Sequence, residues 1–94
     1  MPKTPIIING ATGRIGTCIA AYFAGHDQFD LVAKLDSQHD LTEELTKHNP
    51  TIAIDFTQPN CVYQNCLTII ENGAHPIIGT TGLTAQQIHE LQLI

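Results

Sequence analysis

Basic residues are scarce in this chain. Lysine and arginine together number four, against nine aspartate and glutamate residues, and the formal net charge is −5 at pH 7. Surfaces that bind nucleic acid carry a clustered excess of lysine and arginine, so the composition argues against a nucleic-acid partner. A single bound anion is still compatible with it, because backbone N–H groups can hold phosphate oxygens.

Cysteines and long apolar runs are also few. The three cysteines are Cys18, Cys61 and Cys66, and their odd count and spacing fit neither a redox pair nor a zinc ribbon. No stretch approaches the ~18 apolar residues of a membrane-spanning helix, and the apolar run before Asn9 is too short for a signal peptide. We therefore expect free thiols in a reducing, cytoplasmic protein without membrane contact.

Short apolar runs alternate with stretches of helical periodicity along the chain. The expected strands are 5–9, 30–35, 51–55 and 76–78. The expected helices are 13–24, 40–47, 59–71 and a last one that begins at Thr84. Strands that alternate with helices form a parallel sheet with helices on both faces. The sequence therefore predicts an α/β fold with a doubly wound parallel sheet of the Rossmann type.

Local signals indicate how the helices begin and which faces they bury. Asp40 and Glu43 have the spacing of a capping box, and Pro59 suits the first turn of a helix. In the helix 13–24, apolar side chains recur at the spacing of one buried face. These side chains are Ile15, Cys18, Ile19, Tyr22 and Phe23.

A glycine-rich turn follows the first apolar run and consists of Gly10, Ala11, Thr12, Gly13, Arg14, Ile15 and Gly16. A strand, a glycine-rich turn and a helix in this order usually bind the pyrophosphate of a dinucleotide. The glycines let the backbone approach the phosphates, and the helix start offers unpaired N–H groups and the positive end of its dipole. Arg14 opposes this dipole, which either a bound phosphate or plain solvation would explain. A generic tight turn is the alternative interpretation of the segment.

Asp36 ends the second apolar run, about twenty residues beyond Gly16. An acid at this spacing accepts hydrogen bonds from the adenosine ribose hydroxyls. A 2′-phosphate would meet its negative charge, and the next three residues, 37–39, include no lysine or arginine to offset it. We therefore predict that NADH is favoured over NADPH. A solvated acid at a strand end is the alternative.

Two further loops are expected at the same edge of the sheet, since ligands of such folds bind beyond the carboxyl ends of the strands. The segment 55–57 (Asp-Phe-Thr) follows the third strand, and 79–82 (Gly-Thr-Thr-Gly) follows the fourth. Glycine allows close approach of a ligand, and threonine supplies hydroxyl and N–H donors. An ordinary turn capped by Thr84 is the alternative for the second segment.

The histidines give no catalytic or metal signal. His26, His48 and His75 precede strands, at the edge opposite the expected cofactor, and His89 lies in the last helix. His39 falls at the cofactor edge, but nothing in the sequence positions it as an acid. None has metal-ligand spacing to cysteine or carboxylate, and no nucleophile–base arrangement is visible. The sequence predicts neither a metal site nor a catalytic residue.

Three segments together resemble the 4-hydroxy-tetrahydrodipicolinate reductase (dihydrodipicolinate reductase) family. They are 8–16, 54–59 (Ile-Asp-Phe-Thr-Gln-Pro) and 77–82 (Ile-Ile-Gly-Thr-Thr-Gly). The resemblance covers nearly the whole chain and implies the N-terminal nucleotide-binding domain of an enzyme of lysine biosynthesis through diaminopimelate. It implies hydride transfer from NADH or NADPH to a small cyclic dicarboxylate, by a homotetramer.

The resemblance also implies a role for each matching residue. Gly10, Ala11, Thr12, Gly13, Arg14 and Ile15 would hold the pyrophosphate, and Asp36 the adenosine ribose. Gly79, Thr80 and Thr81 would lie near the nicotinamide, with Phe56 and Thr57 close by. Ser37 stands where the family often has a basic residue, which puts a preference for NADPH in doubt. The family's substrate domain, with its paired histidines and lysine, has no counterpart here. We therefore expect 1–94 to be an incomplete N-terminal domain that binds cofactor without turnover.

Two other classes share parts of this pattern. A short-chain dehydrogenase or an NmrA-like protein would share the glycine turn, but neither Tyr22 nor Tyr63 has the lysine four residues later that the dehydrogenase needs. The segments 54–57 and 79–82 also count against both. A non-enzymatic NAD(H)-sensing module would need the same nucleotide site, so the sequence leaves it open.

Overall fold

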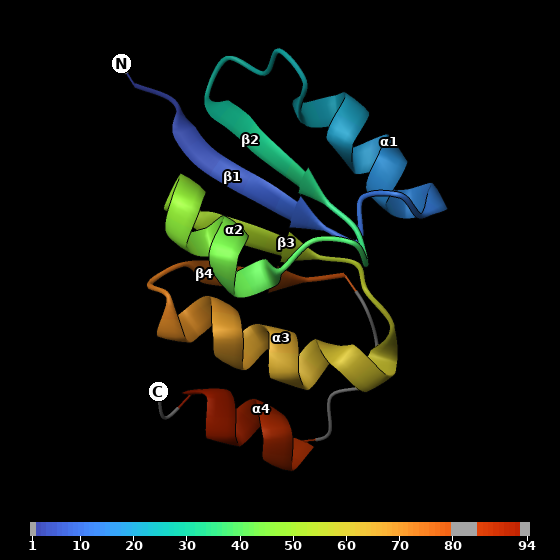
Figure 1. The fold of residues 1–94 in the computed structure, drawn as a ribbon, viewed down its shortest axis with the longest axis vertical. Helices are drawn as coiled ribbons and strands as arrows, with labels where there is room; N and C mark the ends of the chain where they lie inside the picture. Colours follow the sequence, from blue (N-terminus) through green and yellow to red (C-terminus); the bar gives the residue numbers. More distant parts are fainter. Residues whose placement is uncertain (1, 80–84, 93–94) are drawn as a thin grey trace.

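The computed structural model describes residues 2–79 and 85–92. Within these ranges strands and helices alternate along the chain (Figure 1). The strands are β1 (Thr4–Asn9), β2 (Phe29–Leu35), β3 (Ile52–Asp55) and β4 (His75–Ile78). The helices are α1 (Arg14–Phe23), α2 (Leu41–His48), α3 (Pro59–Glu71) and α4 (Ala85–Gln92). The predicted order of elements is confirmed; the predicted cap of the last helix, Thr84, lies outside the described residues.

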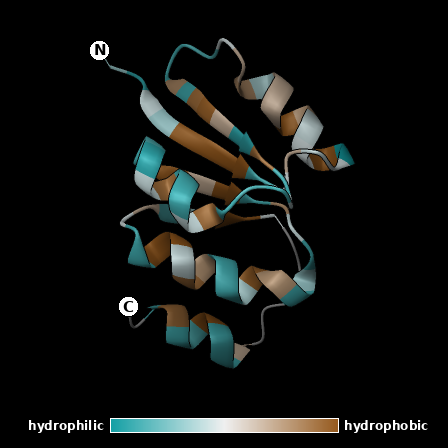
Figure 2. Ribbon diagram, in the orientation of Figure 1, coloured by the Kyte–Doolittle hydropathy of each residue, from teal (hydrophilic) through white to brown (hydrophobic). Residues whose placement is uncertain are grey.

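The strands form one sheet in the order β2-β1-β3-β4, and each pairing is parallel. β1 therefore lies between β2 and β3, and its Ile6, Ile7 and Ile8 are almost completely buried. Figure 2 shows this apolar band running along the strands, with polar residues on the outer sides of the helices. A strand that is apolar at consecutive positions is typical of a parallel sheet covered on both faces.

Successive side chains of β1 point to opposite faces of the sheet and enter two separate cores. Ile7 packs with Leu45 of α2 and Ile69 of α3. Ile6 and Ile8 belong to the second core, which contains Ala20 of α1. Helices therefore cover both faces, and the predicted doubly wound Rossmann-type fold is confirmed.

The predicted buried face of α1 is confirmed for Ile19 and Phe23 and wrong for its other three residues. Ile15 is 58% exposed and Tyr22 65% exposed, and Cys18 is also exposed. The residues that α1 buries are Gly16 and Ala20, with Ile19 and Phe23 partly buried beside them. Small residues let the helix lie close to the sheet, and this close packing sets its rotation more strongly than apolar spacing does.

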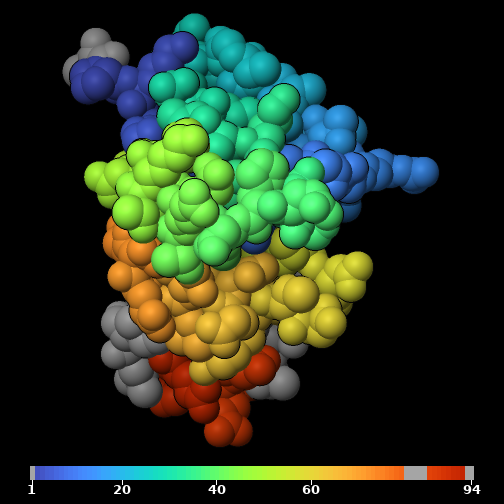
Figure 3. Space-filling view, viewed as in Figure 1, coloured from blue at the N-terminus to red at the C-terminus, as the bar shows by residue number. Residues whose placement is uncertain are grey.

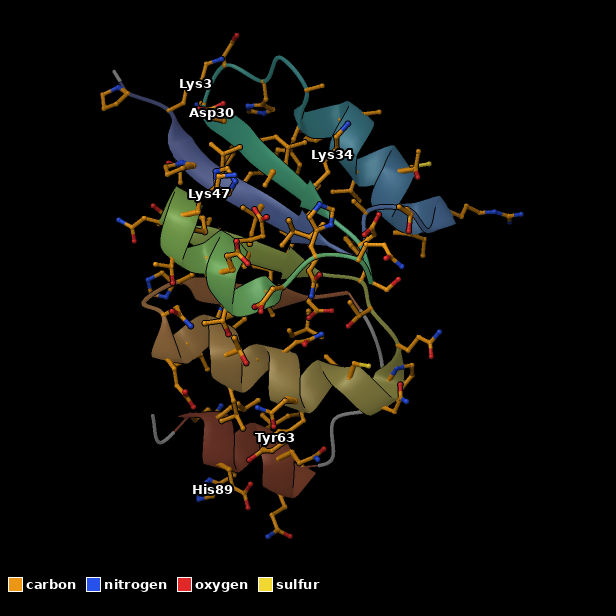
Figure 4. All side chains as sticks on the ribbon, in the orientation of Figure 1. Lys3, Asp30, Lys34, Lys47, Tyr63 and His89 are labelled. Atoms are coloured by element: carbon orange, nitrogen blue, oxygen red, sulfur yellow. The ribbon has the colours of Figure 1, made fainter. Side chains whose placement is uncertain are left out.

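The other helix signals agree with the structure. Asp40 caps α2, because its Oδ1 accepts a hydrogen bond from the Glu43 N–H at 3.1 Å, and Pro59 is the first residue of α3. The Tyr63 hydroxyl of α3 donates to Glu90 Oε2 of α4 at 2.7 Å and holds α4 beside α3 (Figure 4). None of the described helices is long and apolar enough to cross a membrane.

Candidate functional site

A cavity of about 790 Å³ opens at the carboxyl ends of β1, β2 and β3. In Figure 3 the green loop after β2 and the yellow beginning of α3 border this hollow. Its lining includes Gly10, Gly13, Asp36, His39, Phe56 and Thr57. The fold thus brings the glycine turn, the strand-end acid and the loop after β3 to one place, and the volume is that of a small-molecule site.

Two glycines of the turn, Gly10 and Gly16, are packed too closely for side chains. Gly10 has φ +84°, and a β-carbon there would lie 2.8 Å from the carbonyl carbon of Phe56. The N–H groups of Gly10 and Ala11 both donate to the Leu35 carbonyl, each at 2.9 Å, which fixes the turn against the end of β2. A β-carbon on Gly16 would overlap the carbonyl oxygen of Gly10. Glycine at 10 and 16 is therefore needed for the turn itself.

The first turn of α1 has no acid and no side-chain cap. Its N-cap residue is Gly13, where a β-carbon would meet only the Gly10 oxygen, at 3.8 Å. The N–H groups at this helix start are left for another acceptor, and the helix dipole favours an anion there. Arg14 and Ile15 are exposed and do not line the cavity, and Ala11 is buried under the turn.

Asp36 is held in the ionised state by its own turn. The Gln38 N–H donates to Asp36 Oδ1 at 2.8 Å, and His39 Nδ1 lies 3.0 Å from the same oxygen. The hydrogen bond from Gln38 and the contact with His39 lower the pKa of the carboxyl below its ordinary value. The Asp36 side chain is 32% exposed. The turn engages Oδ1, and within the described residues no hydrogen bond to Oδ2 is formed, so Oδ2 can accept hydrogen bonds from a ligand in the cavity.

A buried polar network supports the loop after β3. The Asp55 carboxylate is fully buried, and its Oδ1 accepts hydrogen bonds from the N–H and the hydroxyl of Thr57. Asn65 Nδ2 of α3 donates to Thr57 Oγ1 at 3.0 Å. Asp55 Oδ2 is buried and has no hydrogen bond from the part of the chain that the structure describes. The network fixes Thr57 at the cavity wall.

The Phe56 ring lies directly against the backbone of Gly79. A β-carbon on Gly79 would overlap the ring atoms Cε1 and Cδ1, and the Gly79 N–H donates to the Asp55 carbonyl at 2.9 Å. Gly79 thus joins the end of β4 to the cavity wall through Phe56. Thr80 and Thr81, the other two predicted residues of this loop, lie outside the described residues.

Comparison with known proteins identifies the family. A family model described as "Dihydrodipicolinate reductase, N-terminus" matches residues 4–94. The chain belongs to this family. Among curated relatives, the 4-hydroxy-tetrahydrodipicolinate reductase of Legionella pneumophila (strain Paris) is 44% identical over 89 residues, 95% of this chain and 37% of the relative. The enzyme of the same name from Coxiella burnetii (strain CbuG_Q212) is 40% identical over 83 residues, 88% of this chain and 35% of the relative.

The dihydrodipicolinate reductase resemblance drawn from three sequence segments is thereby confirmed. The dipicolinate-bound dihydrodipicolinate reductase from Paenisporosarcina sp. TG-14 has the same fold, with a TM-score of 0.87 at 18% identity over 98% of this chain and 43% of that one. The chain spans about 37% of the length of the curated Legionella relatives.

Sequence reasoning about this dihydrodipicolinate reductase domain missed one residue of the site, Asn65, and one contact, that of His39, which it had placed at the cofactor edge. Asn65 donates a hydrogen bond to Thr57. The only sequence signal for this contact is that Asn65 is a polar residue of α3, eight positions after Thr57. His39 touches Asp36, and the signal is its i,i+3 spacing within a turn. Among the described residues, no three histidine, cysteine, aspartate or glutamate side chains form a group that could hold a metal.

Proposed function

We propose that this chain is the dinucleotide-binding part of a 4-hydroxy-tetrahydrodipicolinate reductase and binds NADH in the cavity at the carboxyl ends of β1, β2 and β3. One observation carries the proposal. A turn with glycine at 10 and 13, an uncapped helix start, and an ionised acid with one oxygen unengaged by the described residues line the same cavity. The turn and the helix start suit a pyrophosphate, and the acid suits a ribose diol. Membership of the dihydrodipicolinate reductase family supports both assignments.

The residues present fit such a nucleotide. A side chain at Gly13 would occupy the approach to the helix start, and none is there. We assign the pyrophosphate to residues 10–15, the adenosine ribose to Asp36, and the nicotinamide end to the loop of Gly79, Thr80 and Thr81. The nucleotide, when bound, supplies a hydride. The chain's own residues bind and orient it, and the Asp55–Thr57 pair keeps the cavity wall in place.

We further propose that the hydride acceptor is a small cyclic dicarboxylate of lysine biosynthesis and that the complete reductase works as a homo-oligomer. No catalytic acid is assigned within the described residues. Substrate contacts and proton donation are assigned to parts of the reductase other than these 94 residues.

Calorimetric titration with NADH tests the nucleotide site. We expect Asp36→Asn to lose roughly tenfold to a hundredfold in NADH affinity, because a hydrogen bond to a charged group contributes about 1.5–3 kcal/mol. The matched control is Asp30→Asn, an exposed acid at the other end of β2, which should bind like the wild type. Absence of binding by a chain that circular dichroism reports as folded would refute the site. Tighter binding of NADPH than of NADH at about pH 8 would refute the NADH preference alone.

Reductase and sensor roles are separated by an activity assay. The intact gene product should consume NADH only when the cyclic dicarboxylate is added. NADH binding without substrate-dependent consumption would favour an NAD(H)-sensing module instead.

A further inference from the structure

His39 is in contact with the acid assigned to the ribose. Its Nδ1 lies 3.0 Å from Asp36 Oδ1 and 3.0 Å from the Asp36 backbone nitrogen. The His39 N–H donates to the Asp36 carbonyl at 3.1 Å, which closes the turn 36–39. One ring nitrogen therefore faces both a donor and an acceptor. A protonated Nδ1 donates to the carboxylate, and an unprotonated Nδ1 accepts from the backbone N–H.

Within the part of the chain that the structure describes, no lysine or arginine lies beside Asp36 and His39. The cavity lining contains neither lysine nor arginine; its titratable side chains are Asp36, His39 and Cys61 of α3. Lys3 and Lys47 lie toward the end of the sheet where the strands begin, and Lys34 lies on β2 on the side of α1 (Figure 4). Lys34 lines a separate hollow with Thr12, and Arg14 is exposed at the start of α1.

No other charged group near His39 in the described residues supplies a positive charge to the cavity lining. Asp40, the next residue, has its Oδ1 engaged by the Glu43 N–H at the start of α2. The glycine turn before α1 contributes no titratable lining residue, and the loop after β3 contributes none before Cys61. Within the described residues, His39 is thus the one lining side chain that can become positively charged.

We propose that His39 is a specificity-determining residue that makes the choice between NADH and NADPH depend on pH. This rests on the proposed nucleotide site. With a neutral imidazole, the charge of Asp36 is uncompensated; it accepts a ribose hydroxyl and repels a 2′-phosphate. With an imidazolium, Nδ1–H pairs with Asp36 Oδ1, the pair carries no net charge, and the Nε2–H donor, now part of a cation, forms a charge-assisted hydrogen bond with a phosphate oxygen.

The experiment must separate His39 from the ligand's own titration, since a phosphate monoester also takes up a proton near pH 6. We would measure dissociation constants of NAD⁺ and NADP⁺, the acid-stable forms, by calorimetry at about pH 6 and about pH 8. The variants are His39→Gln, His39→Lys and His48→Gln. His48 is the matched control, because it also pairs with a carboxylate, Glu44 Oε2 at 3.1 Å, at the opposite edge of the sheet.

In the wild type and in His48→Gln, the ratio of NADP⁺ to NAD⁺ affinity should rise about tenfold or more from about pH 8 to about pH 6. In His39→Gln the rise in this affinity ratio should shrink to the part that protonation of the ligand's own 2′-phosphate causes. In His39→Lys the preference for NADP⁺ should be high at both pH values. An equal rise in the wild type and His39→Gln would overturn the proposal. If neither nucleotide binds a folded chain at either of the two pH values, the nucleotide site itself is refuted.

Discussion

The carbonyl oxygen of Gly10 lies where a β-carbon of Gly16 would be. The turn after β1 and the first turn of α1 therefore touch backbone to backbone, with no room for a methyl group. This contact places the start of α1 at the end of β1 and explains why small residues face the sheet on this helix.

Gly16→Ala should destabilise the chain strongly. The added methyl forces α1 away from the turn, and overpacking of this kind costs about 1–3 kcal/mol or more. Urea unfolding measures the loss. Gly13→Ala is the matched control in the same turn, since its β-carbon would be at ordinary contact distance, 3.8 Å from the Gly10 oxygen. Its cost should stay below about 1 kcal/mol, the loss expected at an N-cap. Equal losses in the two variants would contradict the packing interpretation.

Gly79→Ala should impair nucleotide binding more than folding. The new β-carbon displaces the Phe56 ring, and the ring must turn into the cavity that it lines. We expect about a tenfold loss of NADH affinity, or ~1.4 kcal/mol, with a much smaller change in the unfolding midpoint. The double variant Gly79→Ala/Phe56→Leu relieves the clash and should recover part of the affinity. If the affinity does not recover, displacement of the Phe56 ring is not the reason for the loss in Gly79→Ala.

Removal of the Asp55 carboxylate should destabilise the loop after β3. Asp55→Ala removes the buried carboxylate that accepts from the N–H and the hydroxyl of Thr57, and loss of a buried hydrogen-bond partner costs about 1–3 kcal/mol. Asp55→Asn keeps one acceptor oxygen and should lose less. Asp30→Ala, at an exposed acid on β2, serves as the control in denaturant unfolding. If Asp55→Asn proves as damaging as Asp55→Ala, the hydrogen bonds to Thr57 are not what stabilises the loop.

Cys66 should react slowly and should make the fold sensitive to alkali. Burial, together with the nearby charge of Asp55, raises the pKa of its thiol to about 11 from an ordinary value of 9.0. Unfolded chains lose this proton at lower pH than the folded chain does, so the free energy of unfolding falls as pH rises from 9.0 toward about 11.

Thermal unfolding across this pH range measures the effect, and Cys66→Ala should weaken the dependence. At about pH 8, near the ordinary range of free thiols, a thiol reagent should modify Cys18 and Cys61 quickly and Cys66 slowly. Fast reaction at all three would show that Cys66 is accessible.

The sequence predicted the sheet and its cavity edge because both depend on patterns along the chain. Consecutive apolar residues in β1 and the glycine spacing after it need no knowledge of distant contacts. The rotation of α1 was mispredicted because the apolar pattern assigns Ile15 and Tyr22 to the buried face by their hydrophobicity alone. In the structure Gly16 and Ala20 face the sheet instead, because their small size allows close packing. The contact of His39 with Asp36 depends on how the turn 36–39 folds back, which its composition does not encode.

The central place of β1 also governs how the chain folds. Along the chain, α1 separates β1 from its partner β2, and α1, β2 and α2 separate β1 from its partner β3. Such non-local parallel pairings form slowly, because the loop between the partners must close before any contact stabilises it. The walls of the cavity come from loops that follow β1, β2 and β3, so the cavity does not exist until both pairings are complete. During refolding, helical signal should therefore appear first and nucleotide capture last.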